Sequence, residues 1–431
     1  MRDRADIERL LEPLARRSPA PDCQAEYYAQ GELSTRFAEN AITQNAASEQ
    51  EGVSLSVAFG TRHGGSSTNG LDKRSLGRLV ETAERVARAS PEDPEYVPPL
   101  DPHSYCEDPV RFRSEVLDLG PAAVADAVRE AIEPALSRDY KASGLFAVGW
   151  GVNAIANSRG LFAFDRYTYV DYSLTVHGPQ GSGHAETYGE SLDGISPHEI
   201  GLSAFETAAA AQNPREIEPG EYTVIFEPRA TLDIMEFMVG NLTARDADEG
   251  VSAFSGKLGQ RLFSDLVTIT TETDAPGLPA PPFGENGLPL RRTVWVQDGV
   301  LQRLRHTRYW AKRKGVEPDA ALFPVVMQGS DRSVQDLVAD CRRGLLVKRL
   351  WYIRYVDRKE LLLTGMTRDG LFLIENGRVV CPVRNLRFNE SPLVFLQNTV
   401  GLSRAQRVGP WAEVPGAMSE GFTFSSKTES L

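Results

Sequence analysis

The sequence predicts an α+β protein, with an N-terminal αβ domain and a C-terminal domain of antiparallel sheets, hairpins and packed helices. Helical stripes of apolar residues alternate with short segments that have the pattern of strands. Two tight-turn dipeptides, Asp298-Gly299 and Asn376-Gly377, each lie between apolar runs, and such pairs supply the positive φ angles of a hairpin turn. The composition, 41% hydrophobic and 25% charged, is typical of a globular protein.

The length of 431 residues favours more than one domain, because a single core stops growing near about 250–300 residues. A proline-rich, acidic segment at residues 90–102 can sustain neither a helix nor a ladder and is expected to be a linker or surface loop. The Ile-Glu-Pro-Gly-Glu-Tyr sequence near residue 216 marks the main boundary. We expect an N-terminal region at 1–215, alternatively divided into 1–95 and 110–215, and a C-terminal domain at 216–431.

The N-terminal elements follow from periodicity. A first helix carries Ile7, Leu10, Leu11 and Leu14 at helical spacing, and apolar residues alternate with small ones over residues 53–59. Further helices are expected at residues 76–89, 122–137 and 196–211. Strands are expected at residues 25–30, 33–37, 53–59, 64–68, 145–150, 153–157, 161–164 and 168–177, with a flexible glycine-rich loop at 178–183.

The C-terminal half opens with an expected strand at residues 222–226 and a helix at 230–242. The two turn dipeptides predict hairpins, and two more apolar segments predict helices. The hairpins pair residues 293–297 with 300–304 and residues 371–375 with 378–383, and the helices cover 333–341 and 392–400.

Charge and targeting signals exclude several classes of protein. The formal net charge of −12 disfavours contact with a phosphate backbone, so we expect no nucleic-acid partner. The four cysteines are far apart and form no CxxC pair, which argues against disulfides or a cysteine zinc site. The charged N-terminus lacks a signal-peptide core, and no apolar run approaches about 18 residues. We expect a soluble, cytoplasmic protein without membrane contact.

Common catalytic motifs are missing from the sequence. It contains no HExxH, no GxSxG and no phosphate-binding loop. His177 and His184 flank the glycine-rich loop and could supply two metal ligands, but a third ligand is not identifiable.

A recognisable series of segments occurs in the C-terminal half. It begins with Val-Ser-Ala-Phe-Ser-Gly-Lys-Leu-Gly at residues 251–259 and continues with Pro-Phe-Gly-Glu-Asn-Gly-Leu-Pro-Leu-Arg-Arg at 282–292. The remaining segments lie at residues 296–302, 329–338, 343–351 and 374–383. In order and spacing the series resembles the TldD/PmbA family, once described as modulators of DNA gyrase and now regarded as metalloprotease-related. Residues 52–57 and 87–91 agree more weakly, so the resemblance spans nearly the whole chain.

The resemblance implies one of two roles. TldD-like members carry HExxxH on the helix before the Ser-x-Phe-Ser-Gly segment; its histidines hold zinc, its glutamate activates water, and a cysteine near the C-terminus is associated with the site. TldE-like members, also called PmbA, lack these ligands and pair with a TldD-type subunit. The heterodimer cleaves peptides that enter an enclosed chamber.

Counting back from Val251 places the HExxxH positions on Met235, Glu236 and Gly240. A thioether suits copper(I) better than hydrolytic zinc, and glycine offers no ligand. Without bound metal, the glutamate has no activated water to deprotonate. Residues 409–431 also hold no cysteine. We therefore predict no catalytic residue and no metal in this chain, zinc in the partner, and a solvated Glu236.

The leading hypothesis is a non-catalytic TldE/PmbA-like subunit that pairs with a TldD-like HExxxH subunit and helps to enclose and bind extended peptides for proteolysis. A homodimer stays an alternative assembly. The second hypothesis is a stand-alone hydrolase that acts on a specialised peptide or small molecule through a repurposed pocket. Tyr309, Lys312 and Arg313 are candidates for a substrate or partner surface, although a strand end with solvent-reaching basic side chains is the preferred interpretation. The third is a regulatory binding module.

Overall fold

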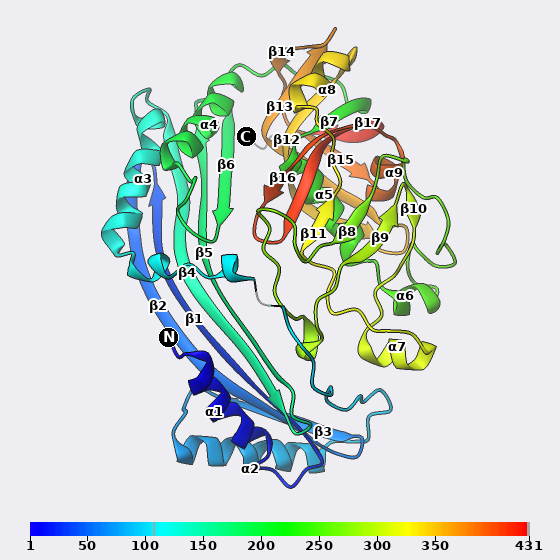
Figure 1. Cartoon of the computed structure of the whole chain (residues 1–431). Coiled ribbons are helices and arrows are strands. Elements are labelled where there is room, and N and C mark those ends of the chain that lie inside the picture. The colour runs from blue at the N-terminus through cyan, green and yellow to red at the C-terminus, as the bar shows by residue number, and fades with distance from the viewer. Residues whose placement is uncertain (107, 429–431) are drawn as a thin grey trace.

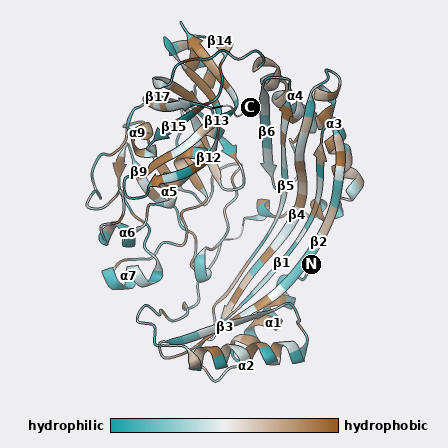
Figure 2. Cartoon of the chain, turned by 180° about the vertical axis from the view of Figure 1, so that it is seen from behind, coloured by the Kyte–Doolittle hydropathy of each residue, from teal (hydrophilic) through white to brown (hydrophobic). Residues whose placement is uncertain are grey.

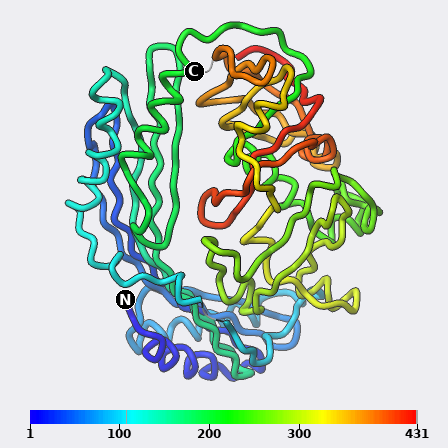
Figure 3. Tube along the Cα trace, turned by 45° about the horizontal axis from the view of Figure 1, so that its top comes forward, coloured from blue at the N-terminus to red at the C-terminus, as the bar shows by residue number. Residues whose placement is uncertain are grey.

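The computed structural model describes residues 1–106 and 108–428, and its architecture is α+β, as predicted. A six-stranded antiparallel sheet built from the N-terminal half faces an eleven-stranded mixed sheet built from the C-terminal half (Figures 1 and 3). The chain crosses from the first sheet to the second after its fourth helix.

The six-stranded sheet is long and curved, with the strand order β3-β2-β1-β4-β5-β6 (Figure 1). Its strands are β1 (Asp22–Ala38), β2 (Ala41–Phe59), β3 (Arg62–Thr68), β4 (Lys141–Asn157), β5 (Phe162–His177) and β6 (Ser182–Gly189). The predicted subdomains 1–95 and 110–215 each contribute three strands, and the pairing of β1 with β4 joins them into one sheet. The domain division itself stays a prediction.

The sequence prediction was wrong in breaking three long strands. It split β1 into 25–30 and 33–37, β4 into 145–150 and 153–157, and β5 into 161–164 and 168–177. Two glycines explain the first two errors. A Cβ at Gly31 would lie 2.3 Å from Trp150 Nε1, and one at Gly151 would lie 2.3 Å from Tyr167 Cζ. Each glycine makes room for an aromatic ring within a strand and does not end it. The glycine-rich loop is also shorter than predicted, because β6 begins at Ser182.

Four helices cover the convex face of this sheet: α1 (Arg4–Ala15), α2 (Lys73–Ala89), α3 (Pro121–Leu136) and α4 (Pro197–Ala210). Apolar side chains from alternate strand positions pack under them, among them Tyr27 beneath α1 and α2, and Phe146 stacked on Tyr172 at 4.1 Å beneath α3 and α4. The intervening positions of β1 are mostly polar, including Glu26, Gln30 and Glu32. The face that turns toward the C-terminal sheet is therefore polar, and hydropathy varies along the strands accordingly (Figure 2).

The eleven-stranded sheet has the order β10-β9-β8-β11-β17-β15-β13-β12-β7, with β14 paired to β13 and β16 paired to β17. Strand β7 also pairs with β17, so five strands close into a ring. The first strands are β7 (Gly220–Phe226), β8 (Ile269–Thr271), β9 (Thr293–Gln297), β10 (Val300–Leu301) and β11 (Val325–Met327). The others are β12 (Arg343–Asp357), β13 (Leu362–Glu375), β14 (Arg378–Pro382), β15 (Leu386–Glu390), β16 (Thr399–Val408) and β17 (Ala412–Lys427).

Five helices pack with this sheet: α5 (Pro228–Gly240), α6 (Ala244–Asp248), α7 (Arg308–Lys314), α8 (Val334–Asp340) and α9 (Pro392–Gln397). Short 3-10 turns cover Pro109–Arg111, Ser114–Asp118 and Glu285–Gly287. Both predicted hairpins are confirmed, with φ of 48° and 78° at Asp298 and Gly299, and 52° and 77° at Asn376 and Gly377. The strand predicted at 300–304 and the helix predicted at 392–400 were both too long, because β10 ends at Leu301 and α9 ends at Gln397.

The two halves of the chain are joined by several polar contacts. Arg229 pairs with Glu186 and Arg407 pairs with Glu190, each across the interface between the sheets. The hydroxyl of Ser182 also donates to the Asp369 carboxylate at 2.7 Å. The four cysteines are free thiols, as expected. None of the helices in the described ranges has the length and apolar character needed to cross a membrane.

Candidate functional site

Helix α5 carries the predicted metal-motif positions and has two distinct faces. Pro228 occupies its first turn, and Asn241 at its end donates from Nδ2 to the Phe237 carbonyl at 2.7 Å. One face is apolar and buried in the C-terminal core. The other bears Arg229, Asp233 and Glu236 at helical spacing. The helix therefore separates a packing face from a charged face.

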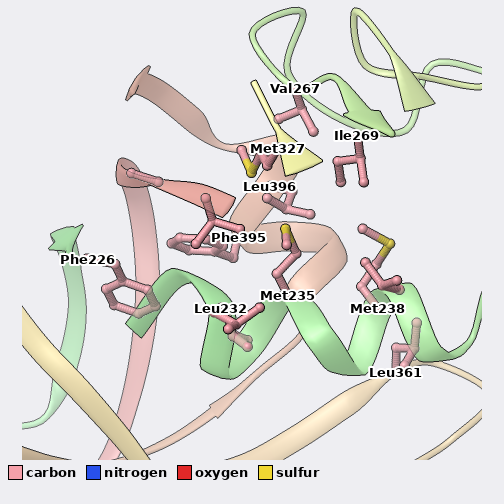
Figure 4. Close-up of a cluster of buried hydrophobic side chains, with 14 of the residues drawn as sticks. Phe226, Leu232, Met235, Met238, Val267, Ile269, Met327, Leu361, Phe395 and Leu396 are labelled. Atoms are coloured by element: carbon pink, nitrogen blue, oxygen red, sulfur yellow. The ribbon is translucent and has the colours of Figure 1, made fainter. Parts of the chain in front are cut away.

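Met235 belongs to the packing face. Its side chain is fully buried, and with Met238 it points from α5 toward Val267, Ile269 and Leu396 (Figure 4). Met235 and these neighbours belong to the hydrophobic core of the C-terminal half. Unbranched, polarisable methionines fill irregular gaps of this kind. Met235 is thus accounted for by core packing.

Glu236 and Gly240 lie outside this apolar cluster. Glu236 is half-buried and forms no hydrogen bond or ion pair with another residue of the described part of the chain. Burial, together with the nearby charge of Asp233, raises the pKa of Glu236. Gly240 is exposed, and a Cβ added to it would meet no atom within 4 Å. The glycine leaves open space at the end of the helix.

The charged face of α5 binds the six-stranded sheet through Arg229. This guanidinium lies 2.7 Å from Asp233 Oδ1 and 2.9 Å from Glu186 Oε1 on β6. Asp233 also accepts from the Leu350 amide at 2.9 Å. Burial opposes ionisation of Glu186, but the hydrogen bond with His184 and the charge of Arg229 outweigh it and lower the pKa of Glu186 to about 2. The network fixes α5 against the polar face of the sheet.

A second polar cluster lies on the same face of the sheet, in a cavity of about 480 Å³ that we call the tyrosine cavity. Tyr167, Tyr169 and Tyr188 line it from the sheet, and Trp411 lines it from the C-terminal half. The rings of Tyr169 and Tyr188 are stacked with their centres 6.2 Å apart. The Tyr169 hydroxyl donates to Glu32 Oε2 at 2.8 Å. Burial raises the pKa of Tyr167, Tyr169 and Tyr188, so all three remain neutral phenols.

The predicted surface at Tyr309, Lys312 and Arg313 lies on α7 and not on a strand end, which corrects the preferred interpretation. The Thr307 hydroxyl accepts from the Trp310 amide, and Gly315 ends the helix with φ of 69°. Lys312 and Arg313 are exposed, and Arg313 lies 4.8 Å from the Trp310 ring centre. Tyr309 is half-buried and lines a separate cavity of about 400 Å³. The structure therefore directs Tyr309 toward a cavity and its two basic neighbours toward solvent.

Family models for the PmbA/TldA metallopeptidases match most of the chain. Domain 1 of that family matches residues 27–87, the central domain residues 115–212, and the C-terminal domain residues 219–426. The chain belongs to the PmbA/TldD family. It is related to metallopeptidases, as the order of its sequence segments predicted.

Individual PmbA/TldD relatives are distant in sequence but similar in length and fold. Metalloprotease PmbA of Escherichia coli O157:H7 is 23% identical over 383 residues, covering 82% of this chain and 80% of that protein. A metalloprotease of Methanothermobacter thermautotrophicus is 25% identical over 285 residues, covering 60% and 61%. The crystal structure of TldE from Thermococcus kodakarensis superposes with a TM-score of 0.86 at 19% identity, covering 94% and 97%. This likeness establishes a common fold.

The resemblance to TldD-like members implies a zinc ion bound by helix α5. A catalytic zinc ion usually takes three protein ligands. Met235, Glu236 and Gly240 offer a buried thioether, one carboxylate and no side chain. Within residues 1–106 and 108–428 no three His, Cys, Asp or Glu side chains are grouped so that they could hold a metal ion. The residues present do not fit a hydrolytic zinc at α5, and the zinc-free state of this chain stays a prediction.

Sequence reasoning missed the polar face of the sheet. His184 is engaged by Thr175 and Glu186, at 3.1 and 3.3 Å, and not in the metal pair proposed with His177. The alternation Tyr167, Tyr169, Asp171 could have revealed a common face, because side chains two apart in a strand point the same way. Trp411 gave no usable signal, since tertiary structure alone brings it to the same cavity as the tyrosines of the sheet.

Proposed function

We propose that the chain is the non-catalytic, TldE/PmbA-like subunit of a metallopeptidase complex. In this role it helps to enclose extended peptides and presents them to a zinc-bearing partner of the TldD type. The observation that carries the proposal is Met235, a fully buried thioether in an apolar cluster, at the position that corresponds to the first histidine of the TldD-like HExxxH motif. A thioether at this position supplies neither the nitrogen nor the oxygen ligand that a water-activating zinc ion takes, which supports a non-catalytic role.

The polar face of the six-stranded sheet supports the peptide-binding part of the proposal. Strand β6 is the last strand of that sheet and pairs only with β5 among the described residues. Extended peptides commonly bind by adding a strand to such an open edge, with alternate side chains entering pockets. Glu186 and Tyr188 lie on β6, beside the charged face of α5 and the tyrosine cavity. A peptide on this edge would therefore contact both polar clusters.

The proposal is tested with this chain and a TldD-type HExxxH protein, each purified alone and then mixed. Metal per chain is measured by mass spectrometry, and hydrolysis is followed with a fluorogenic peptide. We expect zinc in the partner only, and activity only in the mixture. Glu236→Gln in this chain should leave the activity of the mixture intact, whereas the equivalent change in the partner's HExxxH should abolish it. One zinc per copy of this chain, with peptidase activity alone, would overturn the proposal.

A further inference from the structure

The tyrosine cavity has an excess of negative charge. Asp171 lies on the same face of β5 as Tyr169 and is paired in register with Tyr188. Its carboxylate is exposed and has no hydrogen bond or ion pair within the described ranges. Among the described residues, Glu32 accepts a side-chain hydrogen bond only from the Tyr169 hydroxyl. Although Asp171 reaches solvent, the surrounding protein and the carboxylates of Glu186 and Glu32 raise its pKa.

The other charges around the cavity are neutralised in pairs. Arg407 binds both carboxylate oxygens of Glu190, at 3.0 and 2.7 Å. Arg111 binds both carboxylate oxygens of Asp165, at 3.0 and 2.8 Å. Both guanidinium groups are thus engaged elsewhere, and no ion pair to Asp171 or Glu32 occurs among the residues that the structure describes. Two carboxylates of the cavity, those of Asp171 and Glu32, therefore have no cationic partner among the described residues.

The aromatic rings of the cavity already bind cations of the chain itself. Arg111 lies 5.5 Å from the ring centre of Tyr167, and Arg407 lies 5.0 Å from that of Tyr188. Over Tyr169 and Trp411 the described residues place no cation. Electron-rich faces of tyrosine and tryptophan attract ammonium and guanidinium groups. Two rings of the cavity, one from the sheet and one from the C-terminal half, are therefore available to a cation from outside.

Trp411 is positioned to receive such a group. Its residue is 51% exposed although tryptophan is usually well buried. It lies in the turn between β16 and β17, two residues after Gly409, whose φ is 65°. The Val325 amide donates to the Trp411 carbonyl at 2.9 Å and anchors its backbone. An exposed indole on an anchored turn keeps its position at the cavity wall without being covered by the chain.

We propose that the tyrosine cavity binds the cationic side chain of a lysine or arginine in an extended peptide. This inference rests on the proposed peptide-binding function and names the side chain that the subunit selects. Tyr169 and Trp411 supply ring faces, and Asp171 supplies the opposite charge. A neutral side chain would gain no attraction from the Asp171 and Glu32 carboxylates and would bind more weakly, and an acidic side chain would be repelled by them.

The first experiment uses a degenerate decapeptide library passed over the immobilised full chain, with retained peptides sequenced by mass spectrometry. We expect lysine and arginine to be enriched at one position. A retained peptide is then synthesised with lysine, norleucine or glutamate at that position, and each affinity is measured by fluorescence anisotropy. The lysine form should bind about tenfold more tightly than the norleucine form. Spermidine serves as a probe for a free cation and should compete only weakly.

Two variants test the contributions of the Asp171 carboxylate and the Trp411 indole independently. Asp171→Asn should weaken the lysine peptide about tenfold and leave the norleucine peptide unchanged. Trp411→Ala should weaken the lysine peptide by several-fold, about the loss of one cation–π contact. Asp265→Asn is the matched control, because it removes the same charge from an exposed carboxylate outside the residues that line the cavity. It should change neither affinity.

The outcomes distinguish this inference from the proposed function. Peptides that bind equally well with lysine, norleucine or glutamate would overturn the cation site and leave peptide binding intact. Retention of no peptide from the library would overturn the proposed peptide-binding function, and the cation site with it. Spermidine that binds more tightly than the lysine peptide would show that the cavity selects a free cation. Equal effects of Asp171→Asn and Asp265→Asn would refute the assigned role of Asp171.

Discussion

Replacing Arg229 by methionine tests how α5 is held against the six-stranded sheet. The change removes the cation that neutralises Asp233 and Glu186, at 2.7 and 2.9 Å. Asp233 is 5% exposed and would keep only the Leu350 amide as a partner. Breaking a buried ion pair costs about 3–5 kcal/mol. Because the Arg229 side chain is itself 32% exposed, we expect the lower end of that range, about 3 kcal/mol.

The pH dependence of this loss has a defined sign. Burial already raises the pKa of Asp233, and loss of Arg229 removes the main opposing charge. The folded variant would then retain a proton on Asp233 at a pH where the unfolded chain has released it. Folding that takes up a proton becomes less favourable as the pH rises. The deficit of Arg229→Met should therefore grow as the pH rises above 3.8, the ordinary pKa of an aspartate.

The assay is urea unfolding followed by circular dichroism and tryptophan fluorescence at several pH values. Arg229→Met with Asp233→Asn should recover part of the stability, because asparagine is neutral and still accepts from the Leu350 amide. Arg9→Met is the control, since Arg9 is exposed and its ion pair, with Asp6 one turn away, is a surface pair. An Arg229→Met protein as stable as the Arg9→Met protein would refute the reasoning, as would a deficit that is independent of pH.

Three further predictions follow from the same structure. The pKa of Glu186 is lowered from 4.5 to about 2, so its contribution to stability should be lost as the pH falls through that interval. The urea midpoint of Glu186→Gln should therefore change less with pH between 4.5 and about 2 than the midpoint of the native chain. Gly201→Ala should lower the melting temperature by several degrees, because its Cβ would lie 1.9 Å from the Ala131 carbonyl oxygen, whereas Gly240→Ala should be neutral or stabilising by up to about 1 kcal/mol. Met235→His combined with Gly240→His would restore the residues of the HExxxH motif. We expect this variant to bind no stoichiometric zinc, and its free energy of unfolding to fall by about 2 kcal/mol or more, because a polar imidazole replaces a buried thioether. Tight zinc binding measured by calorimetry would contradict the conclusion that α5 does not fit a hydrolytic zinc ion.

Local signals in the sequence located many elements correctly. The Asp-Gly and Asn-Gly turns fixed both hairpins, because their residues adopt the positive φ angles that the pattern requires. The predicted helix at 333–341 is confirmed as α8, and its first turn is held by a capping box between Ser333 and Asp336. These features depend on neighbours within a few residues.

Features that depend on distant residues were not predictable. Gly31 resembles a strand break in sequence, and only the indole of Trp150 on the neighbouring strand explains why glycine is needed there. Strand β17 was not predicted at all; it pairs with strands from four separate parts of the C-terminal half. At the candidate site, Met235 could be named from the motif, but the Arg229–Glu186 contact joins residues 43 positions apart. The spacing of residues along the sequence does not predict such a contact.

The pairing of β7 with β17 has a consequence for biosynthesis. Residues 220–226 emerge from the ribosome almost two hundred positions before residues 412–427 that complete their ring of strands. Until translation is nearly finished, β7 and its neighbours expose unpaired backbone groups to other nascent chains. The ring of strands can therefore close only late in synthesis, whereas most strand pairs of the N-terminal sheet, such as β1 with β2 and β4 with β5, join segments made one after the other.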